Sequence, residues 1–457
     1  MATTTATALE LEEIDQVSRP SNTSLATVPS RESPNEYPEH DSNLINDVAE
    51  ASRIVDAGVP EGGYGWVVIL CSGTLAFWSI GVSYSWGVMQ QGLIDEGFST
   101  AQVLPWVGSL CVAMVSISAI INARILRSLG SQRTSLLGVI LLVVGGVIIS
   151  FSTRNIGGLF VGTGIVTGQG LSLCFMVSAT IPSQYFNRKR GLATGLIYAA
   201  GGAGGAANSF IMDGLIKSVG TAWSFRIVAL MTLAMGLPAA FFNHDRIAPN
   251  RTTFIDWSLF RDPKFFLLFL CGVVATFPLL VPPFFLPLYS VSIGMPGAAA
   301  ALVAGFNLAS AVGRIILGLC CDKIGSLNSL FMALVLVALS MLALWPVSQS
   351  LGPLIAFVVI NGAACGGFFS VFPTVAGSVF GSARVSIAMG MLVTGWSGGY
   401  LLGAPIAGYL LADYGGEAAG FKAYRPAIYY AGSMALGAAG FVAWVRLRMN
   451  KKLMAKV

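Results

Sequence analysis

The stretch that decides the fold is Pro60-Glu61-Gly62-Gly63-Tyr64-Gly65-Trp66, because a long apolar run begins directly after it. The sequence before this stretch is polar, and the sequence after it consists of apolar segments joined by short polar connections. Glycines allow a tight backbone turn, and tyrosine and tryptophan rings favour the headgroup level of a membrane. The stretch therefore predicts the entry of a first membrane-spanning helix, although an ordinary aromatic belt would look the same.

The composition predicts an all-α membrane protein. The chain is 55% hydrophobic and only 10% charged, with a mean hydropathy of +0.74, whereas soluble domains carry about 25% charged residues. Apolar segments of about 20 residues, the length that crosses a bilayer, recur after residue 64. They are uninterrupted rather than alternating, which favours helices over barrel strands. We expect twelve transmembrane helices, at 64–90, 103–126, 134–152, 157–181, 191–216, 223–242, 265–290, 298–320, 328–347, 352–376, 385–411 and 425–446.

The basic residues predict the orientation of these helices. With the N-terminus in the cytoplasm, seventeen lysines and arginines fall in the cytoplasmic connections and C-terminal tail, and only four in the outer connections. Such an excess marks the cytoplasmic side. We therefore expect a multi-pass protein of the cell membrane with both termini in the cytoplasm.

The helices divide into two pseudo-symmetric halves of six. Phe186-x3-Arg190 followed by Ala193-x-Gly195 has a counterpart in Phe380-x3-Arg384 followed by Ala388-x-Gly390. Likewise, Arg124 to Gly130 corresponds to Gly318-x3-Asp322-x2-Gly325. Similar halves suit a transporter that binds its substrate at the midplane between them. We expect an N-terminal half at 62–242, a cytoplasmic linker at 243–264, a C-terminal half at 265–446 and a basic cytoplasmic tail at 447–457.

Residues 1–61 predict a disordered acidic cytoplasmic tail, because they hold twelve acidic and three basic residues and no apolar periodicity. They lack the pattern of a signal peptide. A regulatory tail and an inert extension both fit this composition. All seven cysteines fall within or beside the predicted spans, which favours packing over disulfide bonding. The glycosylation sequons at Asn22 and Asn250 lie on the predicted cytoplasmic side and should stay unmodified.

Two motifs resemble the signatures of the monocarboxylate porter family of the major facilitator superfamily. The first is the stretch at 60–66, and the second is Tyr185-Phe186-Asn187-Arg188-Lys189-Arg190-Gly191-Leu192-Ala193-Thr194-Gly195. Gly403-Ala404-Pro405-Ile406-Ala407-Gly408 is similar to the family's glycine–proline segment, with Ala404 where a proline is usual. The resemblance covers roughly Pro60 to Arg448 and implies the major facilitator fold. It marks the following as gate or signature residues: Glu61, Gly62, Gly63, Trp66, Arg188, Lys189, Arg190 and Asp322. Anchoring to anionic lipid would also explain the three basic residues.

Arg314 is the predicted centre of the substrate site. Apart from Arg124, Arg425 and Arg446 at the ends of predicted spans, it is one of three acidic or basic residues within them. Each such residue costs at least ~2.5–3.5 kcal/mol at mid-membrane. The other two have simpler explanations: Asp213 can pair with Lys217 one turn away, and Arg226 is shallow enough to reach the interface.

Asn307 and Ser310 share a helix face with Arg314, and a guanidinium binds a carboxylate through two parallel hydrogen bonds. Anion binding by Arg314 is the first interpretation. In the second, Arg314 holds its helix to backbone carbonyls of the cytoplasmic gate.

The resemblance also shows two departures. Animal members of the family use an arginine matching Arg314, an aspartate one turn earlier and a lysine in the first span. Here Ser310 and Val88 stand at the last two positions. Both histidines, His40 and His244, lie in polar segments, so the family's usual proton route is not expected. The pattern resembles the divergent fungal branch, which includes importers and secondary-metabolite exporters.

Aromatic and amide side chains complete the predicted cavity and suit an organic molecule larger than lactate, although helix packing would account for each of them. They are Tyr84, Trp86, Gln169, Tyr198, Asn208, Asn361, Phe368, Phe369, Trp396 and Tyr400.

The sequence contains no P-loop, no HExxH motif and no nucleophile–histidine pair in the spans. We therefore expect no enzyme, no cofactor, no metal site and no nucleic-acid partner. A receptor or sensor would be expected to carry a longer soluble domain. The sequence favours a secondary transporter of an organic anion or carboxylate-bearing metabolite, with export of a fungal secondary metabolite included. The alternative is import of a neutral or larger nutrient, such as a vitamin. The expected partners are the small-molecule substrate and the lipid bilayer.

Overall fold

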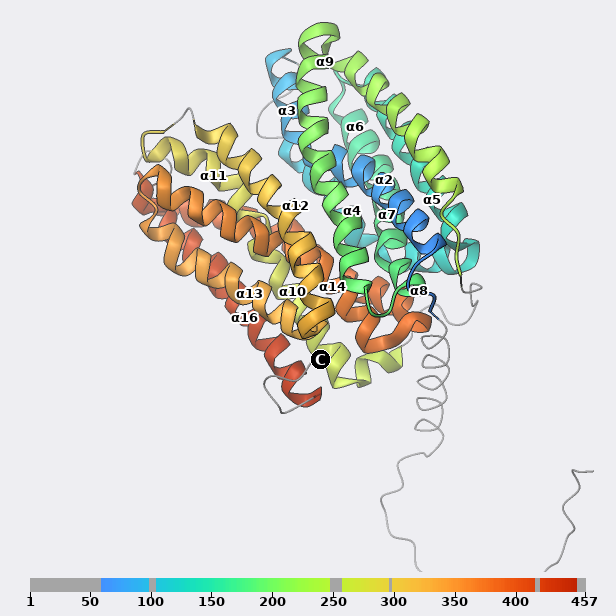
Figure 1. The fold of residues 1–457 in the computed structure, drawn as a ribbon. Coiled ribbons are helices and arrows are strands. Elements are labelled where there is room, and N and C mark those ends of the chain that lie inside the picture. The colour runs from blue at the N-terminus through green and yellow to red at the C-terminus, as the bar shows by residue number, and fades with distance from the viewer. Residues whose placement is uncertain (1–58, 98–103, 247–256, 296–297, 416–419, 450–457) are drawn as a thin grey trace, which may run out of the picture. The chain divides into compact units, whose positions relative to one another are not determined.

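The computed structural model describes residues 59–97, 104–246, 257–295, 298–415 and 420–449, and all their regular elements are helices (Figure 1). The predicted all-α class is therefore confirmed. Residues 1–58 of the predicted tail lie outside the described residues, as do both sequons, 247–256 of the predicted linker and 450–457 of the C-terminal tail. All seven cysteines are free thiols within the described part, and six of them are buried.

The helices of the first half, used here for residues 64–241, are α2 Tyr64–Tyr84, α3 Trp86–Asp95, α4 Leu104–Ile117, α5 Ala119–Phe151, α6 Ile156–Leu159, η1 Phe160–Thr167, α7 Gly168–Thr180, α8 Pro182–Tyr185 and α9 Arg190–Phe241. Those of the second half, residues 257–449, are η2 Trp257–Arg261, α10 Pro263–Leu279, α11 Val281–Ser292, α12 Ala299–Ile324, α13 Ser326–Leu339, η4 Ser340–Leu344, η5 Trp345–Val347, α14 Leu351–Thr394, α15 Ser397–Asp413, η7 Phe421–Tyr424 and α16 Arg425–Met449.

Ten helical stretches of the described chain are long and apolar enough to cross a membrane. One of them, α9, has 52 residues and turns at Gly220, so it contains two of the predicted spans. Another predicted span is formed by α4 together with the start of α5. When these are divided, helices occupy all twelve predicted segments.

Four predicted spans are interrupted, among them the eleventh, which breaks at Gly395 and Trp396 between α14 and α15. The first breaks at Ser85, whose hydroxyl donates to Val82 O, and the second at Ser118, whose hydroxyl donates to Met114 O. Serine back-bonding of this kind competes with the helical hydrogen bonds and bends a helix. The break at Leu280 follows Pro278, which removes a backbone donor.

Four glycines turn the chain between consecutive helical segments in the same way. Gly130, Gly220, Gly325 and Gly381 have φ of 79°, 81°, 100° and 76°, with ψ between 153° and 169°. Only glycine adopts this region readily. The sequence match between Gly130 and Gly325 therefore coincides with a shared backbone conformation.

Small residues bring the central helices into backbone contact. A Cβ atom on Gly204 of α9 would collide with Phe77 O of α2, and one on Gly195 would lie 2.6 Å from Arg314 O of α12. A Cβ atom on Gly313 would collide with Ala363 O of α14. Close approach of this kind holds membrane helices together where lipid offers no hydrophobic driving force.

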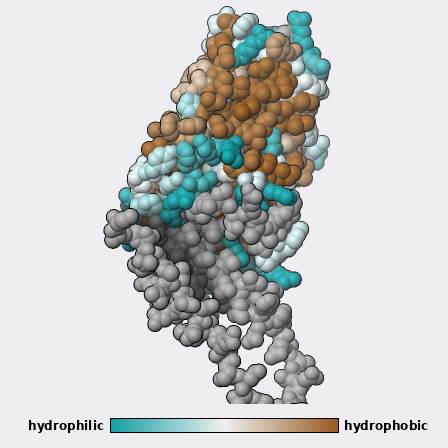
Figure 2. Space-filling view, turned by 90° about the vertical axis from the view of Figure 1, so that its right-hand side faces the viewer, coloured by the Kyte–Doolittle hydropathy of each residue, from teal (hydrophilic) through white to brown (hydrophobic). Residues whose placement is uncertain are grey.

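The outward faces of the helices are apolar. Large apolar side chains lie exposed on α5 and on the second part of α9, such as Ile140, Val144, Leu230 and Met235. Figure 2 shows this face as a hydrophobic surface with hydrophilic residues beyond it on both sides. The expected pair of Asp213 and Lys217 is present at 2.7 Å. These features confirm a multi-pass membrane protein.

The turn at Gly220 provides a test of the backbone geometry. A Cβ atom there would meet nothing closer than 3.7 Å, so a Gly220→Ala change adds backbone strain and no clash. We expect it to lower the free energy of unfolding by about 1–3 kcal/mol. In the matched control Gly214→Ala, six residues earlier in α9, the added methyl meets open space, and stability should stay or rise by about 0.5–1 kcal/mol. Equal thermal unfolding curves of the two purified variants would contradict this account.

Candidate substrate-binding site

Arg314 lies in α12 with only 1% of its surface exposed. Its Nη1 donates to the backbone oxygen of Tyr198 at 2.6 Å, and its Nη2 donates to the hydroxyl of Tyr84 at 3.0 Å. The guanidinium carbon is 5.6 Å from the ring centres of both Tyr84 and Phe369. Its Nε is buried and has no hydrogen-bond partner among the described residues. The guanidinium therefore retains donor capacity that the described protein does not use.

Tyrosines from three helices surround this guanidinium. Tyr84 ends α2 and is 37% exposed, while Tyr198 of α9 is buried and its hydroxyl has no partner among the described residues. Tyr400 of α15 lies close enough for electrostatic interaction with Arg314 and with both other tyrosines. Arg314 and the three tyrosines thus form one cluster contributed by both halves, and the guanidinium with the adjacent Tyr84 hydroxyl suits a carboxylate.

An aromatic wall adjoins the cluster. Trp396 lies 5.6 Å from Phe368, 6.2 Å from Tyr400 and 6.1 Å from Phe175, measured between ring centroids. Phe175 in turn lies 5.6 Å from Tyr198. Phe368 and Trp396 are fully buried, and their rings pack against one another. The wall gives the cluster an apolar border suited to the carbon skeleton of a ligand.

Three other predicted site residues lie in contacts between helices. The Ser310 hydroxyl packs on Gly366 of α14. Asn208 donates to Phe77 O of α2 at 3.4 Å, and Asn361 donates to the Ser340 hydroxyl at 2.8 Å. Asn307 is half-buried on α12. The structure thus brings six of the predicted site residues together: Arg314, Tyr84, Tyr198, Trp396, Tyr400 and Phe368. It places three others at neighbouring helix interfaces: Ser310, Asn208 and Asn361.

One polar network was not foreseen from the sequence. Gln169 of α7 donates to Asn122 Oδ1 at 2.6 Å, and Asn122 Nδ2 donates to the hydroxyls of Ser118 and Ser172 at 3.0 and 2.7 Å. Gln169 was expected in the cavity, but Asn122 was missed. An amide within a predicted apolar span, four residues before its end, was the available signal.

Val88, at the position of the animal family's lysine, packs against an apolar cluster of the first half that includes Trp78 and Met212. This environment offers a charged side chain no partner among the residues of the cluster, which agrees with an apolar residue at this position.

The two signature motifs contact each other. Glu61 accepts hydrogen bonds from the backbone N–H groups of Asn187, Arg188 and Lys189. The ring of Trp66 lies 4.9 Å from that of Phe186. Both contacts require the backbone to turn between Glu61 and Trp66.

The glycines of the first signature allow this turn. Gly63, the N-cap of α2, has φ 59°, and Gly62 lies beside the Trp66 indole. Sequence spacing does not reveal that residues 61 and 187 meet.

The basic triplet divides into two parts. Arg188 and Lys189 are exposed, whereas Arg190 is buried, donates to Phe186 O and lies against Gly377 of α14. Beside it, Asp322 accepts hydrogen bonds from the N–H groups of Gly191 and Leu192 at 2.8 and 2.9 Å. A carboxylate at a helix N-terminus satisfies free N–H groups and opposes the positive end of the helix dipole. These contacts join the halves at what we call the basic end.

Asp322 gives a test of this junction. Cys321 is 4% exposed and packs on Gly191, so it is a native reporter of the α9–α12 contact. Asp322→Ala removes a helix cap worth about 0.5–2 kcal/mol, and Cys321 alkylation should therefore accelerate roughly two- to thirtyfold. Half-buried Cys320 serves as the internal reference, and Asp413→Ala, at an exposed helix end, as the control. An unchanged rate by peptide mass spectrometry would count against a latch at this position.

Comparison with known proteins agrees with the fold. A family model described as the Major Facilitator Superfamily matches residues 67–350 and 296–456. The chain is 28% identical over 365 residues to the aspyridones efflux protein apdF of Emericella nidulans, covering 78% of this chain and 74% of that protein. It is 27% identical over 425 residues to monocarboxylate transporter 10 of Danio rerio, covering 86% and 81%.

Solved structures show the same architecture. The human organic anion transporter MFSD10 superposes with a TM-score of 0.63 at 13% identity, covering 83% of this chain and 98% of that one. The transporter FucP in its outward conformation superposes with a TM-score of 0.67 at 12% identity, covering 84% and 99%.

Proposed function

The chain belongs to the Major Facilitator Superfamily and is a membrane transporter of small molecules, and on this premise we propose that its cargo is an organic anion or a carboxylate-bearing metabolite. The observation that carries the proposal is the buried guanidinium of Arg314, with its unpartnered Nε and the hydroxyls beside it. Its charge costs at least ~2.5–3.5 kcal/mol at mid-membrane, and a bound carboxylate would offset that cost.

The described carboxylates support a cargo that brings its own negative charge. Glu61, Glu96, Asp245 and Asp322 each accept hydrogen bonds at the start of a helical segment. Each is therefore engaged away from Arg314. A ligand carboxylate accepting from Nε and the Tyr198 hydroxyl would pair both groups.

The relatives support an anion and an exporter. One similar protein is named for efflux of aspyridones and another is named a monocarboxylate transporter, and a similar fold belongs to an organic anion transporter. We propose export of a fungal secondary metabolite as the physiological direction. The aromatic wall beside Arg314 fits a cargo larger than a short-chain acid.

We assign the basic end to the cytoplasm, because seventeen of the lysines and arginines fall on that side. The contacts of Asp322, Glu61 and Arg190 close this end, and Tyr84 is 37% exposed beside buried Arg314. This arrangement corresponds to an outward-open transporter, the state named for FucP. The halves at 62–242 and 265–446 would rock about the contacts of α9 with α12 and of α5 with α14.

Import of a neutral or larger nutrient is the second candidate. The hydrogen bond from Arg314 to the backbone oxygen of Tyr198 favours it, because that bond can hold α12 to α9 without any ligand. In that case the guanidinium is a structural residue.

Replacement of Arg314 distinguishes the two candidates. With an anionic cargo, Arg314→Gln should reduce transport by roughly 30- to 5,000-fold, since losing one partner of a buried charge pair costs about 2–5 kcal/mol. Tyr84→Phe, which removes one hydroxyl, should reduce transport by about tenfold or less. Arg226→Gln is the control, because Arg226 lies between the exposed rings of Phe151 and Trp223. A neutral cargo that still passes through folded Arg314→Gln would contradict the proposal.

The cargo itself is found by metabolite profiling of cells and medium with and without the chain. For an exporter, an acidic compound should accumulate inside cells that lack it. A compound left in the medium would show import, and a cargo without negative charge would assign Arg314 to structure.

A further inference from the structure

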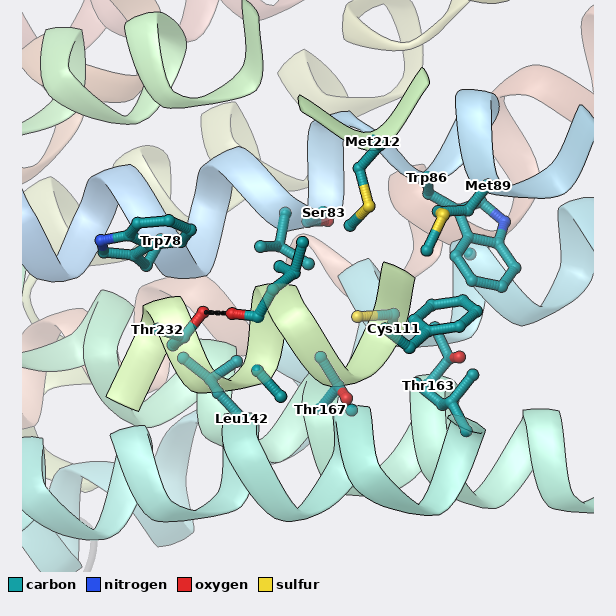
Figure 3. Close-up of a pocket in the computed structure, with 17 residues that line it drawn as sticks. Trp78, Ser83, Trp86, Met89, Cys111, Leu142, Thr163, Thr167, Met212 and Thr232 are labelled. Carbon is teal, nitrogen blue, oxygen red and sulfur yellow. Dashed lines mark hydrogen bonds between the residues drawn. The ribbon is translucent and has the colours of Figure 1, made fainter. Parts of the chain in front are cut away.

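A cavity of about 50 Å³ lies inside the first half (Figure 3). Its seventeen lining residues all fall between positions 78 and 232, on α2, α3, α4, α5, η1 and α9. Arg314, Tyr84, Tyr198 and Tyr400 are not among these lining residues, so the cavity is distinct from the cluster around Arg314. About 10–15 Å³ holds one water molecule by this kind of measure, so the cavity has room for several waters or one small organic group.

The lining is mainly apolar and aromatic, and none of its residues is charged. In Figure 3, Trp78 lies toward one end of the cavity and Trp86 and Met89 toward the other. Met212 lies on one side, opposite Thr163 and Thr167. Methionine side chains are unbranched and adaptable, so this wall can adjust to the outline of a ligand.

One hydroxyl in the cavity is unpaired. Thr167 and Thr232 donate to Gly162 O and Val228 O of their own helices, at 2.9 and 2.8 Å. In contrast, the Thr163 hydroxyl is buried without a hydrogen-bond partner among the described residues. An unpaired buried polar group is unfavourable, and an acceptor atom on a ligand would relieve it.

An irregular helix presents Thr163 to the cavity. Residues Phe160–Thr167 form a π-helix, a rare conformation that often accommodates an inserted residue and often marks functional sites. The segment from the N-cap Asn155 to Phe186 is one residue longer than its counterpart from the N-cap Ser350 to Phe380. The π-helix thus accounts for one extra residue that the second half lacks.

Aromatic rings pack together near the corresponding position of the second half. Counting from the two ends of these segments places Thr163 opposite Val358 or Phe357, both almost fully buried. Phe357 stacks on Trp345 at 4.6 Å, and Tyr289 packs against Trp345 and Tyr424 at 6.0 and 5.4 Å. The fold can therefore pack aromatic side chains near this position, and the first half has a threonine and a cavity instead.

We propose that this cavity is a second binding site, for an uncharged organic molecule of about four heavy atoms that carries one hydrogen-bond-accepting oxygen. The rings and thioethers of the lining contact its apolar part, and Thr163 donates to its oxygen. A charged molecule is excluded, because the lining provides no counter-charge.

1-Propanol, a molecule of about the size of four waters, is a suitable probe, and the methyl groups of Met89 and Met212 are built-in reporters. The purified full chain, labelled with ¹³C at methionine methyl groups, is titrated by NMR, with Met89→Leu and Met212→Leu variants assigning the two signals. We expect both signals to shift saturably. Exposed Met235 is the reference for partition into detergent, and a shift at Met89 and Met212 that only parallels that of Met235, or no shift, would overturn the proposal.

Three variants test the role of the threonine. Thr163→Phe supplies the ring that the second half carries and should abolish the saturable shift. Thr163→Val keeps the volume and should weaken binding about five- to tenfold, because only the hydroxyl is lost. Thr232→Val is the matched control, since that hydroxyl is already paired within its helix, and its affinity should stay unchanged.

If Thr163→Phe does not fold, the two valine variants decide. Equal affinities of Thr163→Val and the parent would overturn the proposal, as would a folded Thr163→Phe that still binds.

Discussion

The structure depends on the backbone contact between α9 and α12. Gly195 has no side chain where α9 crosses α12, and a Cβ atom there would lie 2.6 Å from the carbonyl oxygen of Arg314. The same approach brings the Arg314 guanidinium to the carbonyl of Tyr198, one turn further along α9. A single steric condition therefore joins the two halves and buries the charge at the candidate site. If the halves rock as proposed, opening the basic end changes this contact, which would couple the proposed gate to the proposed site.

Carboxylates in this protein organise helix ends. Glu96 and Asp245 accept from the residues that follow the glycine turns at 220 and 130, and Asp322 accepts from the start of α9. Helix N-termini carry free N–H groups and partial positive charge, which makes them suitable partners for carboxylates near a membrane surface. The negative charges thus hold the ends of the bundle, and in the proposed function the buried positive charge of Arg314 is left for a ligand.

The halves share a plan but differ inside. They have the same glycine turn at residues 130 and 325, yet aromatic rings pack together inside the second half and a cavity lies inside the first. A π-helix of the first half, Phe160–Thr167, contributes Thr163 and Thr167 to the lining of this cavity. Repeated architecture therefore does not imply repeated sites, because the side chains inside the two halves differ.

The sequence by itself determined the helical class, the twelve apolar segments and the isolation of Arg314 among apolar residues, because hydropathy and charge are local properties of the chain. It also identified Tyr84 and Tyr400, whose place near Arg314 follows from their position along their segments. Only the tertiary structure decided that Ser310 faces Gly366, that Glu61 reaches residues 187–189 and that Thr163 borders a cavity. These three contacts depend on which faces of two helices meet. That choice is set by how helices distant in the sequence cross one another, and the sequence pattern of a single helix does not contain it.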